Sequence, residues 1–278
     1  MVSSWNNYTM QSNSKLDTRS LESLRTILRK AIKSDFEVAR GISIIEDSGI
    51  EIATLKSLIQ NPVESNKKRI GVTGAPGVGK STFLNTFIST QDLAHYKIAV
   101  IAIDPSSRIT KGALLGDRIR FTEDSNSESI YFRSMATRGA FGGLNNSIEP
   151  VLYFLANCGF SLIFVETVGV GQNEVEVAVY VDFVINVLDA NVGDEIQMEK
   201  AGIMEIGDVY FVNKRDGQAN NHFITSLKTF VDNSKRKSSS KPEVIVGSAI
   251  SGEGLKGVAR HLGLSSSSEL GLDGEKAK

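Results

Sequence analysis

The chain has 278 residues, of which 41% are hydrophobic and 23% are charged, and its formal net charge is −1 at pH 7. This composition is ordinary for a protein with a substantial core, and the balanced charge offers no general attraction to nucleic acid or to an anionic membrane. A single cysteine, Cys158, excludes an internal disulfide, and three scattered histidines provide no metal-ligand cluster. No apolar run is long enough to span a membrane, so we expect a cytoplasmic protein.

The first 66 residues divide into a polar tail and a helical extension. Residues 1–19 are rich in Ser and Asn and are predicted to be disordered. From Leu21 onward, apolar residues recur with helical spacing in three successive segments, followed by a polar linker. We therefore predict a small helical extension over residues 20–66.

A glycine-rich loop follows a short β-type run that ends at Thr73, and it opens a helical pattern. Its glycines allow the backbone to wrap around a diphosphate, and the helix N-terminus adds unpaired N–H donors. Lys80 supplies a mobile positive charge, and the hydroxyl of Ser81 can ligate Mg²⁺. A chance glycine turn is the alternative, but the flanking strand and helix favour a site for a nucleoside triphosphate. The predicted nucleotide-binding residues are Gly74, Ala75, Pro76, Gly77, Val78, Gly79, Lys80, Ser81 and Thr82.

Strand and helix patterns alternate after this loop. The predicted strands cover residues 97–103, 129–132, 161–165, 182–188, 208–212 and 243–246, and the predicted helices cover 148–156, 195–204, 225–231 and 254–261. This alternation predicts an α/β fold of the P-loop NTPase type, with a doubly wound, mainly parallel sheet over residues 67–263. Residues 264–278 are polar and serine-rich, which predicts a flexible tail.

Three carboxylates occupy positions suited to a metal–phosphate site. Asp104 and Glu166 each end a buried strand, and Asp117 follows in Leu-Leu-Gly-Asp. With Ser81, these residues are the predicted Mg²⁺ ligands, directly or through water. Asp104 precedes a proline and could instead begin a turn, and Asp117 could be an exposed helix residue.

Glu166 also begins an acid-x-x-Gly element that ends at Gly169. In nucleotide switches, the N–H of this glycine contacts the γ-phosphate and so senses its loss. Many small GTPases place a water-orienting glutamine directly after the glycine, but Val170 stands there and the glutamine comes later, as Gln172. We therefore predict slow intrinsic hydrolysis that a partner or a second subunit accelerates.

The tetrapeptide Asn213-Lys214-Arg215-Asp216 follows a predicted strand and suits guanine recognition. The carboxylate of Asp216 can accept both hydrogen bonds from the guanine N1–H and exocyclic amine, a donor pair that adenine lacks. The residues Ser248, Ala249 and Ile250, after the last strand, can offer backbone N–H groups to the guanine carbonyl. Together, the two segments predict GTP and GDP as the ligands.

Several of these motifs together resemble the methylmalonyl-CoA mutase-associated GTPases of the MeaB/ArgK type. The resemblance covers residues 36–260 and rests on the segments 39–46, 103–107, 115–117, 166–172 and 193–197. It implies a homodimeric G-protein chaperone for an adenosylcobalamin-dependent acyl-CoA mutase, in which GTP binding and hydrolysis gate cofactor delivery and protect or reactivate the mutase.

The resemblance also implies an additional switch around residues 193–200, with Asp194 and Lys200 as its candidate residues. Lys200 thereby joins Lys80, Glu166 and Gln172 as a candidate catalytic residue. Two departures are visible: position 201, often basic in relatives, is Ala, and a polar tail stands where the family usually has a helical arm that helps to form the dimer.

Two other functions are compatible with the glycine-rich loop at residues 74–82. Relatives have been described as kinases linked to basic amino-acid transport, but no segment offers a clear acceptor pocket or catalytic base. A metal-delivery GTPase for metalloenzyme maturation typically carries a Cys- or His-rich segment, which one cysteine and three histidines do not supply.

Overall fold

The computed structural model describes residues 18–29, 34–59, 62, 67–90, 96–104, 130–136, 146–167, 173–190, 202–214, 220–233 and 241–264. Within these residues, seven strands form one sheet in the order β3-β2-β4-β1-β5-β6-β7, and every neighbouring pair is parallel. The strands are β1 (Lys68–Thr73), β2 (Ile98–Asp104), β3 (Ile130–Ala136), β4 (Leu162–Glu166), β5 (Phe183–Asp189), β6 (Val209–Asn213) and β7 (Glu243–Gly247). The predicted parallel α/β sheet is confirmed.

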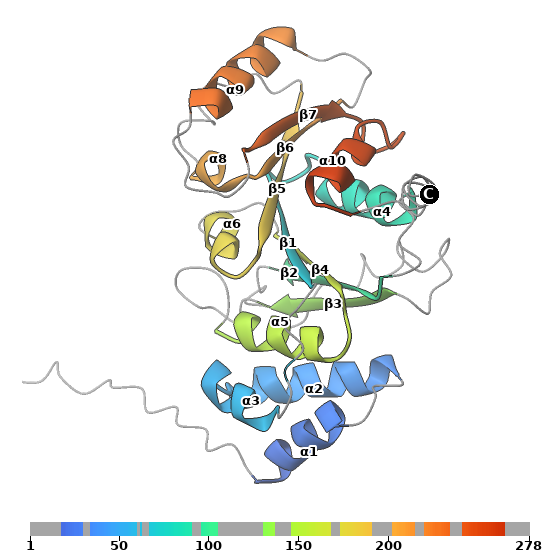
Figure 1. Ribbon diagram of the computed structural model, residues 1–278, viewed down its shortest axis with the longest axis vertical. Helices are drawn as coiled ribbons and strands as arrows, with labels where there is room; N and C mark the ends of the chain where they lie inside the picture. The colour runs from blue at the N-terminus through green and yellow to red at the C-terminus, as the bar shows by residue number, and fades with distance from the viewer. Residues whose placement is uncertain are drawn as a thin grey trace, which may run out of the picture.

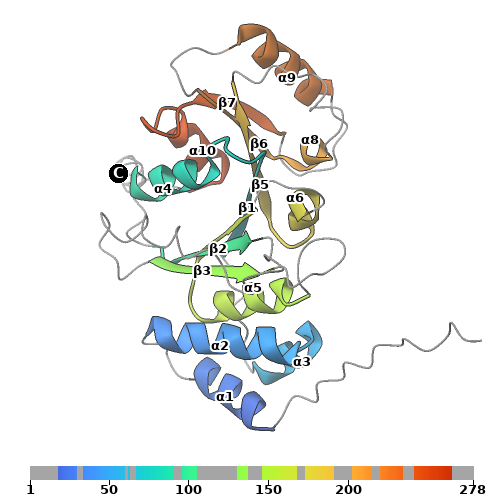
Figure 2. The ribbon, with the colours of Figure 1, turned by 180° about the vertical axis from the view of Figure 1, so that it is seen from behind.

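Helices cover both faces of this sheet (Figures 1 and 2). On one face, α4 (Lys80–Thr90) and α10 (Leu255–His261) pack on apolar residues such as Ile70, Phe164 and Phe211. The opposite face is covered by α5 (Ile148–Asn157), α6 (Asn173–Glu176), the 3-10 helix η3 (Val177–Val179), α8 (Ile203–Ile206) and α9 (Asn221–Asn233). The central strands are buried on both faces, which explains their continuous apolar sequences.

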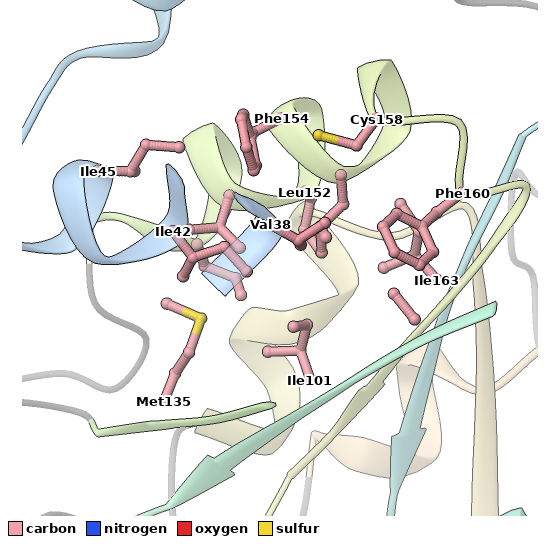
Figure 3. Close-up of a cluster of buried hydrophobic side chains, with 14 of the residues drawn as sticks. Val38, Ile42, Ile45, Ile101, Met135, Leu152, Phe154, Cys158, Phe160 and Ile163 are labelled. Atoms are coloured by element: carbon pink, nitrogen blue, oxygen red, sulfur yellow. The ribbon is translucent and has the colours of Figure 1, made fainter. Parts of the chain in front are cut away.

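Three N-terminal helices form a further layer outside α5: α1 (Thr18–Arg29), α2 (Asp35–Ser48) and α3 (Ile52–Leu58). Figure 3 shows Ile42 and Ile45 of α2 in the same cluster as Phe154 of α5 and Ile101 of β2. The extension therefore shares one continuous core with the sheet.

One partly buried ion pair joins the extension to the edge strand β3. The guanidinium of Arg133 donates to Ser43 Oγ at 3.1 Å and to Glu46 Oε2 at 2.5 Å, and the side chain of Glu46 is only 6% exposed. Such a pair is costly to break, because one charge would remain buried without its partner. It fixes α2 at one position along the sheet.

Cys158 lies in the same core, at the end of α5 (Figure 3). Burial raises the pKa of its thiol well above the ordinary value. A thiol in this state is a poor nucleophile at neutral pH, so Cys158 acts as a structural residue of the core.

The boundaries of the elements differ from the predicted ones by a few residues. The helix predicted over 195–204 is seen only as α8, because residues 191–201 lie outside the described part of the chain. The short helices α6 and η3 were not predicted. Leu264, placed by prediction in the polar tail, is buried in the core beside α10.

Candidate nucleotide-binding site

The glycine-rich loop lies between the carboxyl end of β1 and the first turn of α4. Gly74 has φ +136°, and a Cβ there would lie 2.2 Å from the carbonyl oxygen of Val187. Gly79 has φ +98°, and its Cβ would lie 2.8 Å from Nδ2 of Asn213. Both positions therefore require glycine, for backbone conformation and for lack of space.

The side chain of Lys80 folds back over this loop. Its ammonium donates to the carbonyl of Gly74 at 2.6 Å and to that of Ala75 at 3.0 Å, and the residue is only 6% exposed. The positive charge is thus held where the loop curls, beside the N-terminus of α4. Helix dipole, backbone N–H groups and ammonium together make this loop a site for an anion such as a diphosphate.

Ser81 and Glu166 meet beside the loop. The hydroxyl of Ser81 donates to Oε1 of Glu166 at 2.6 Å, because β4 is the direct neighbour of β1 and both strands end at the same edge. A hydroxyl and a carboxylate side by side are hard oxygen donors of the kind that Mg²⁺ prefers. The two residues therefore fit a magnesium ion next to the phosphate loop.

Asp104 ends β2, which lies next to β4, so its backbone is at the same edge of the sheet. Its side chain lies outside what the structure describes. The predicted residues Asp117, Gly169, Gln172, Lys200 and Asp216 also fall outside the described residues. Their assignments stay predictions.

Asn213 joins three loops through its side-chain amide. Its Nδ2 donates to the carbonyl of Val78 at 2.8 Å, and its Oδ1 accepts from the N–H of Ala249 at 2.9 Å. The N–H of Lys214 donates to the carbonyl of Gly247 at 2.8 Å. The segment expected to recognise the base is therefore attached directly to the phosphate loop and to residues 248–250.

The residues of the loop after β7 differ in solvent exposure. Ala249 is fully buried, whereas Ile250 is 74% exposed. Glu253, which sequence reasoning did not single out, pairs with Lys214 across this loop at 3.2 Å. No local pattern identifies Glu253, because its partner lies 39 residues away.

Among the described residues, no helix combines the length and the apolar character that a membrane-spanning segment needs. Within the same residues, His, Cys, Asp and Glu side chains nowhere gather in a group of three that could hold a metal ion.

A seven-stranded parallel sheet with a glycine loop, a folded-back lysine and an adjacent Ser–Glu pair defines a P-loop nucleoside triphosphatase. A crystal structure of a LAO/AO transport system kinase has the same fold, with a TM-score of 0.64 and 26% identity, over 88% of this chain and 74% of the other. A protein of Pyrococcus horikoshii is 39% identical over 222 residues, which are 79% of this chain and 70% of the relative. GTPase ArgK of Escherichia coli is 42% identical over 156 residues, or 56% of this chain and 47% of the relative.

The family described as methylmalonyl Co-A mutase-associated GTPase MeaB matches residues 38–269. The chain belongs to this family. It is therefore a guanine-nucleotide-binding protein and a GTPase. The resemblance inferred from the motifs is confirmed.

Proposed function

We propose that this GTPase serves an adenosylcobalamin-dependent acyl-CoA mutase of the methylmalonyl-CoA mutase type. GTP binding and hydrolysis would gate the loading of the cofactor and protect or reactivate the mutase. The observation that carries the proposal is the match to the MeaB family over residues 38–269, because the family description names association with this mutase. Following the same family, we extend the proposal to a homodimer in the cytoplasm.

In this proposal the phosphate loop holds the triphosphate. The backbone N–H groups of residues 74–82, apart from Pro76, which has none, would surround the β-phosphate, and Lys80 would turn from its carbonyl partners toward the β- and γ-phosphate oxygens. Ser81 and Glu166, with Asp104 and Asp117, would hold Mg²⁺. The ion, when bound, neutralises charge that develops on the phosphate oxygens.

The base lies, in this proposal, between the segment 213–216 and residues 248–250. Asp216 accepts hydrogen bonds from guanine, and Lys214 lies along the base. Asn213 keeps the two loops together, a role supported by its contacts with Val78 and Ala249. This arrangement selects GTP over ATP, because adenine would leave the carboxylate of Asp216 unmatched.

Hydrolysis requires that a water molecule attack the γ-phosphate in line with the leaving oxygen. We assign the orientation of that water to Gln172, the sensing of the γ-phosphate to Gly169, and a partner-dependent contribution to Lys200. Because no glutamine directly follows Gly169, we expect slow turnover by the isolated protein and faster turnover with the mutase.

The test is phosphate release from GTP and from ATP, with Mg²⁺ or with EDTA, in the presence and absence of a cobalamin-dependent mutase. We expect hydrolysis of GTP only, dependence on Mg²⁺, and stimulation by the mutase. An Asp216→Asn variant serves as the specificity control and should shift preference from guanosine to xanthosine nucleotides.

Equal use of ATP would contradict the base assignment. A GTPase rate that the mutase does not change would contradict the chaperone role. Transfer of phosphate to a protein or small molecule in place of water would favour the kinase alternative.

A further inference from the structure

The loop that follows β7 folds back on itself. Gly252 and Gly254 have φ values of +80° and +84°, so two of the three residues 252–254 adopt the left-handed backbone conformation that favours glycine. The N–H of Ser248 donates to the carbonyl of Glu253 at 3.0 Å, and the N–H of Gly252 donates to the carbonyl of Ser248 at 2.9 Å. Glu253 is thereby brought back beside the end of β7.

The backbone of Glu253 lies against Gly247 so closely that a Cβ at Gly247 would be 2.1 Å from the Glu253 carbonyl oxygen. Gly247 is also the residue whose carbonyl accepts from the N–H of Lys214. The positions of Glu253, Gly247 and Lys214 are therefore mutually fixed by backbone contacts.

The side chains of Glu253 and Lys214 complete this arrangement. Oε1 of Glu253 lies 3.2 Å from Nζ of Lys214, and the side chains are 61% and 21% exposed. Lys214 is thus held at both ends, by its backbone N–H and by its ammonium. A lysine side chain normally has many rotamers, and this ion pair favours one of them before any ligand arrives.

We propose that Glu253 is a positioning residue for the guanine nucleotide: it holds the ammonium of Lys214, so that the stem of this lysine lies along the place of the base. The proposal rests on the base site proposed above. Fixing a side chain in its binding conformation before the ligand arrives lowers the entropic cost of binding. Glu253 therefore slows nucleotide release without touching the nucleotide.

Because Glu253 is exposed, its carboxylate is expected to affect nucleotide binding and to contribute little to the stability of the fold. Ion pairs with one exposed partner contribute little to stability and are screened by salt. Loss of the carboxylate should consequently leave the fold intact and change mainly the lifetime of the bound nucleotide.

The experiment measures release of a fluorescent GDP analogue by stopped flow from the wild type, E253Q, K214M and the double variant. We expect each single variant to release the analogue roughly 3- to 10-fold faster. The double variant should be no faster than K214M, because both changes remove the same constraint. Glu51→Gln is the matched control, since Glu51 is an exposed acid before α3 whose side chain makes no capping hydrogen bond.

Salt distinguishes positioning from a structural role. Release from the wild type should accelerate as ionic strength rises, whereas release from E253Q should respond much less. Thermal unfolding of E253Q should match that of the wild type, which shows that the variant is folded.

Wild-type release rates in E253Q, additive effects in the double variant, or equal salt dependence would overturn the role of Glu253 while leaving the base site in place. Failure of the wild type to prefer the GDP analogue over its ADP counterpart would overturn both the base site and this inference.

Discussion

Asn213 illustrates how a single side chain can join parts of a site that are remote in the sequence. Its amide accepts from Ala249 and donates to Val78, and the residue is only 5% exposed. Because the amide offers both a donor and an acceptor, it matches one backbone carbonyl and one backbone N–H at once. No apolar or acidic residue of similar size could satisfy both groups.

We expect Asn213→Ala to lower the free energy of unfolding by about 2–5 kcal/mol, since two buried backbone groups would lose their partners. The affinity for GDP should fall at least ~10-fold, because the phosphate loop and the base loop would no longer hold one another. Urea unfolding and titration with a fluorescent nucleotide measure the two effects.

Asn157→Ala is the control for this variant. Asn157 donates to the carbonyl of Tyr153 on α5, away from the glycine loop. Its removal should leave nucleotide affinity unchanged. Equal affinities for Asn213→Ala and the wild type would show that the bridge is not needed for binding.

At the level of elements, helix α2 packs against α5 at a point where only a glycine fits. A Cβ at Gly41 would lie 2.2 Å from Cζ of Phe154, and Phe154 is fully buried. The surrounding core is closely packed, so the ring has little room to move. The close approach of the two helices therefore depends on the absence of a side chain at Gly41.

Gly41→Ala should destabilise the protein by about 1–3 kcal/mol through overpacking, even though alanine favours a helix. Gly257→Ala in α10 is the matched control, because a Cβ there would be 3.4 Å from its nearest neighbour, Ile245. The control should stabilise the protein by up to about 1 kcal/mol. Chemical unfolding of both variants decides the matter: equal changes would mean that helix propensity alone governs both positions.

At the scale of the whole molecule, the N-terminal helices behave as part of the main body. Residues of α1, α2 and α3 share one apolar core with α5 and with strands β2 and β4. The partly buried pair of Arg133 and Glu46 adds a polar connection to the edge strand. The predicted boundary at residues 66 and 67 therefore separates sequence patterns, whereas the packing is continuous across it.

Removal of residues 1–59 should expose the apolar face of α5, including Phe154, and leave Arg133 without its carboxylate partner. We expect the shortened chain to aggregate, or to bind a hydrophobic dye and unfold at a clearly lower temperature. Gel filtration and dye fluorescence measure these outcomes. A monomeric shortened chain with wild-type thermal stability would show that the extension is an independent unit.

Much of the fold could be predicted from sequence, because strand and helix patterns are local. The continuous apolar runs of β2 and β4 and the helical spacing in α2 are visible within five to fourteen residues. The short helices α6 and η3 escaped prediction, since four and three residues are too few to display a period. The burial of Leu264 was not predicted either, because most of the residues that it packs against lie in distant elements.

By itself, the sequence determined the chemistry that can be expected: a glycine loop for phosphate, candidate oxygen ligands for a metal ion, and a segment suited to guanine. These properties follow from residue type and short spacing. Only the tertiary structure decided which residues meet, because β1 lies between β4 and β5 in the sheet and no local pattern encodes that order. Ser81 reaches Glu166 across 85 residues, and Asn213 reaches Val78 across 135. Both contacts depend on the parallel sheet, because it brings the carboxyl ends of its strands to one edge.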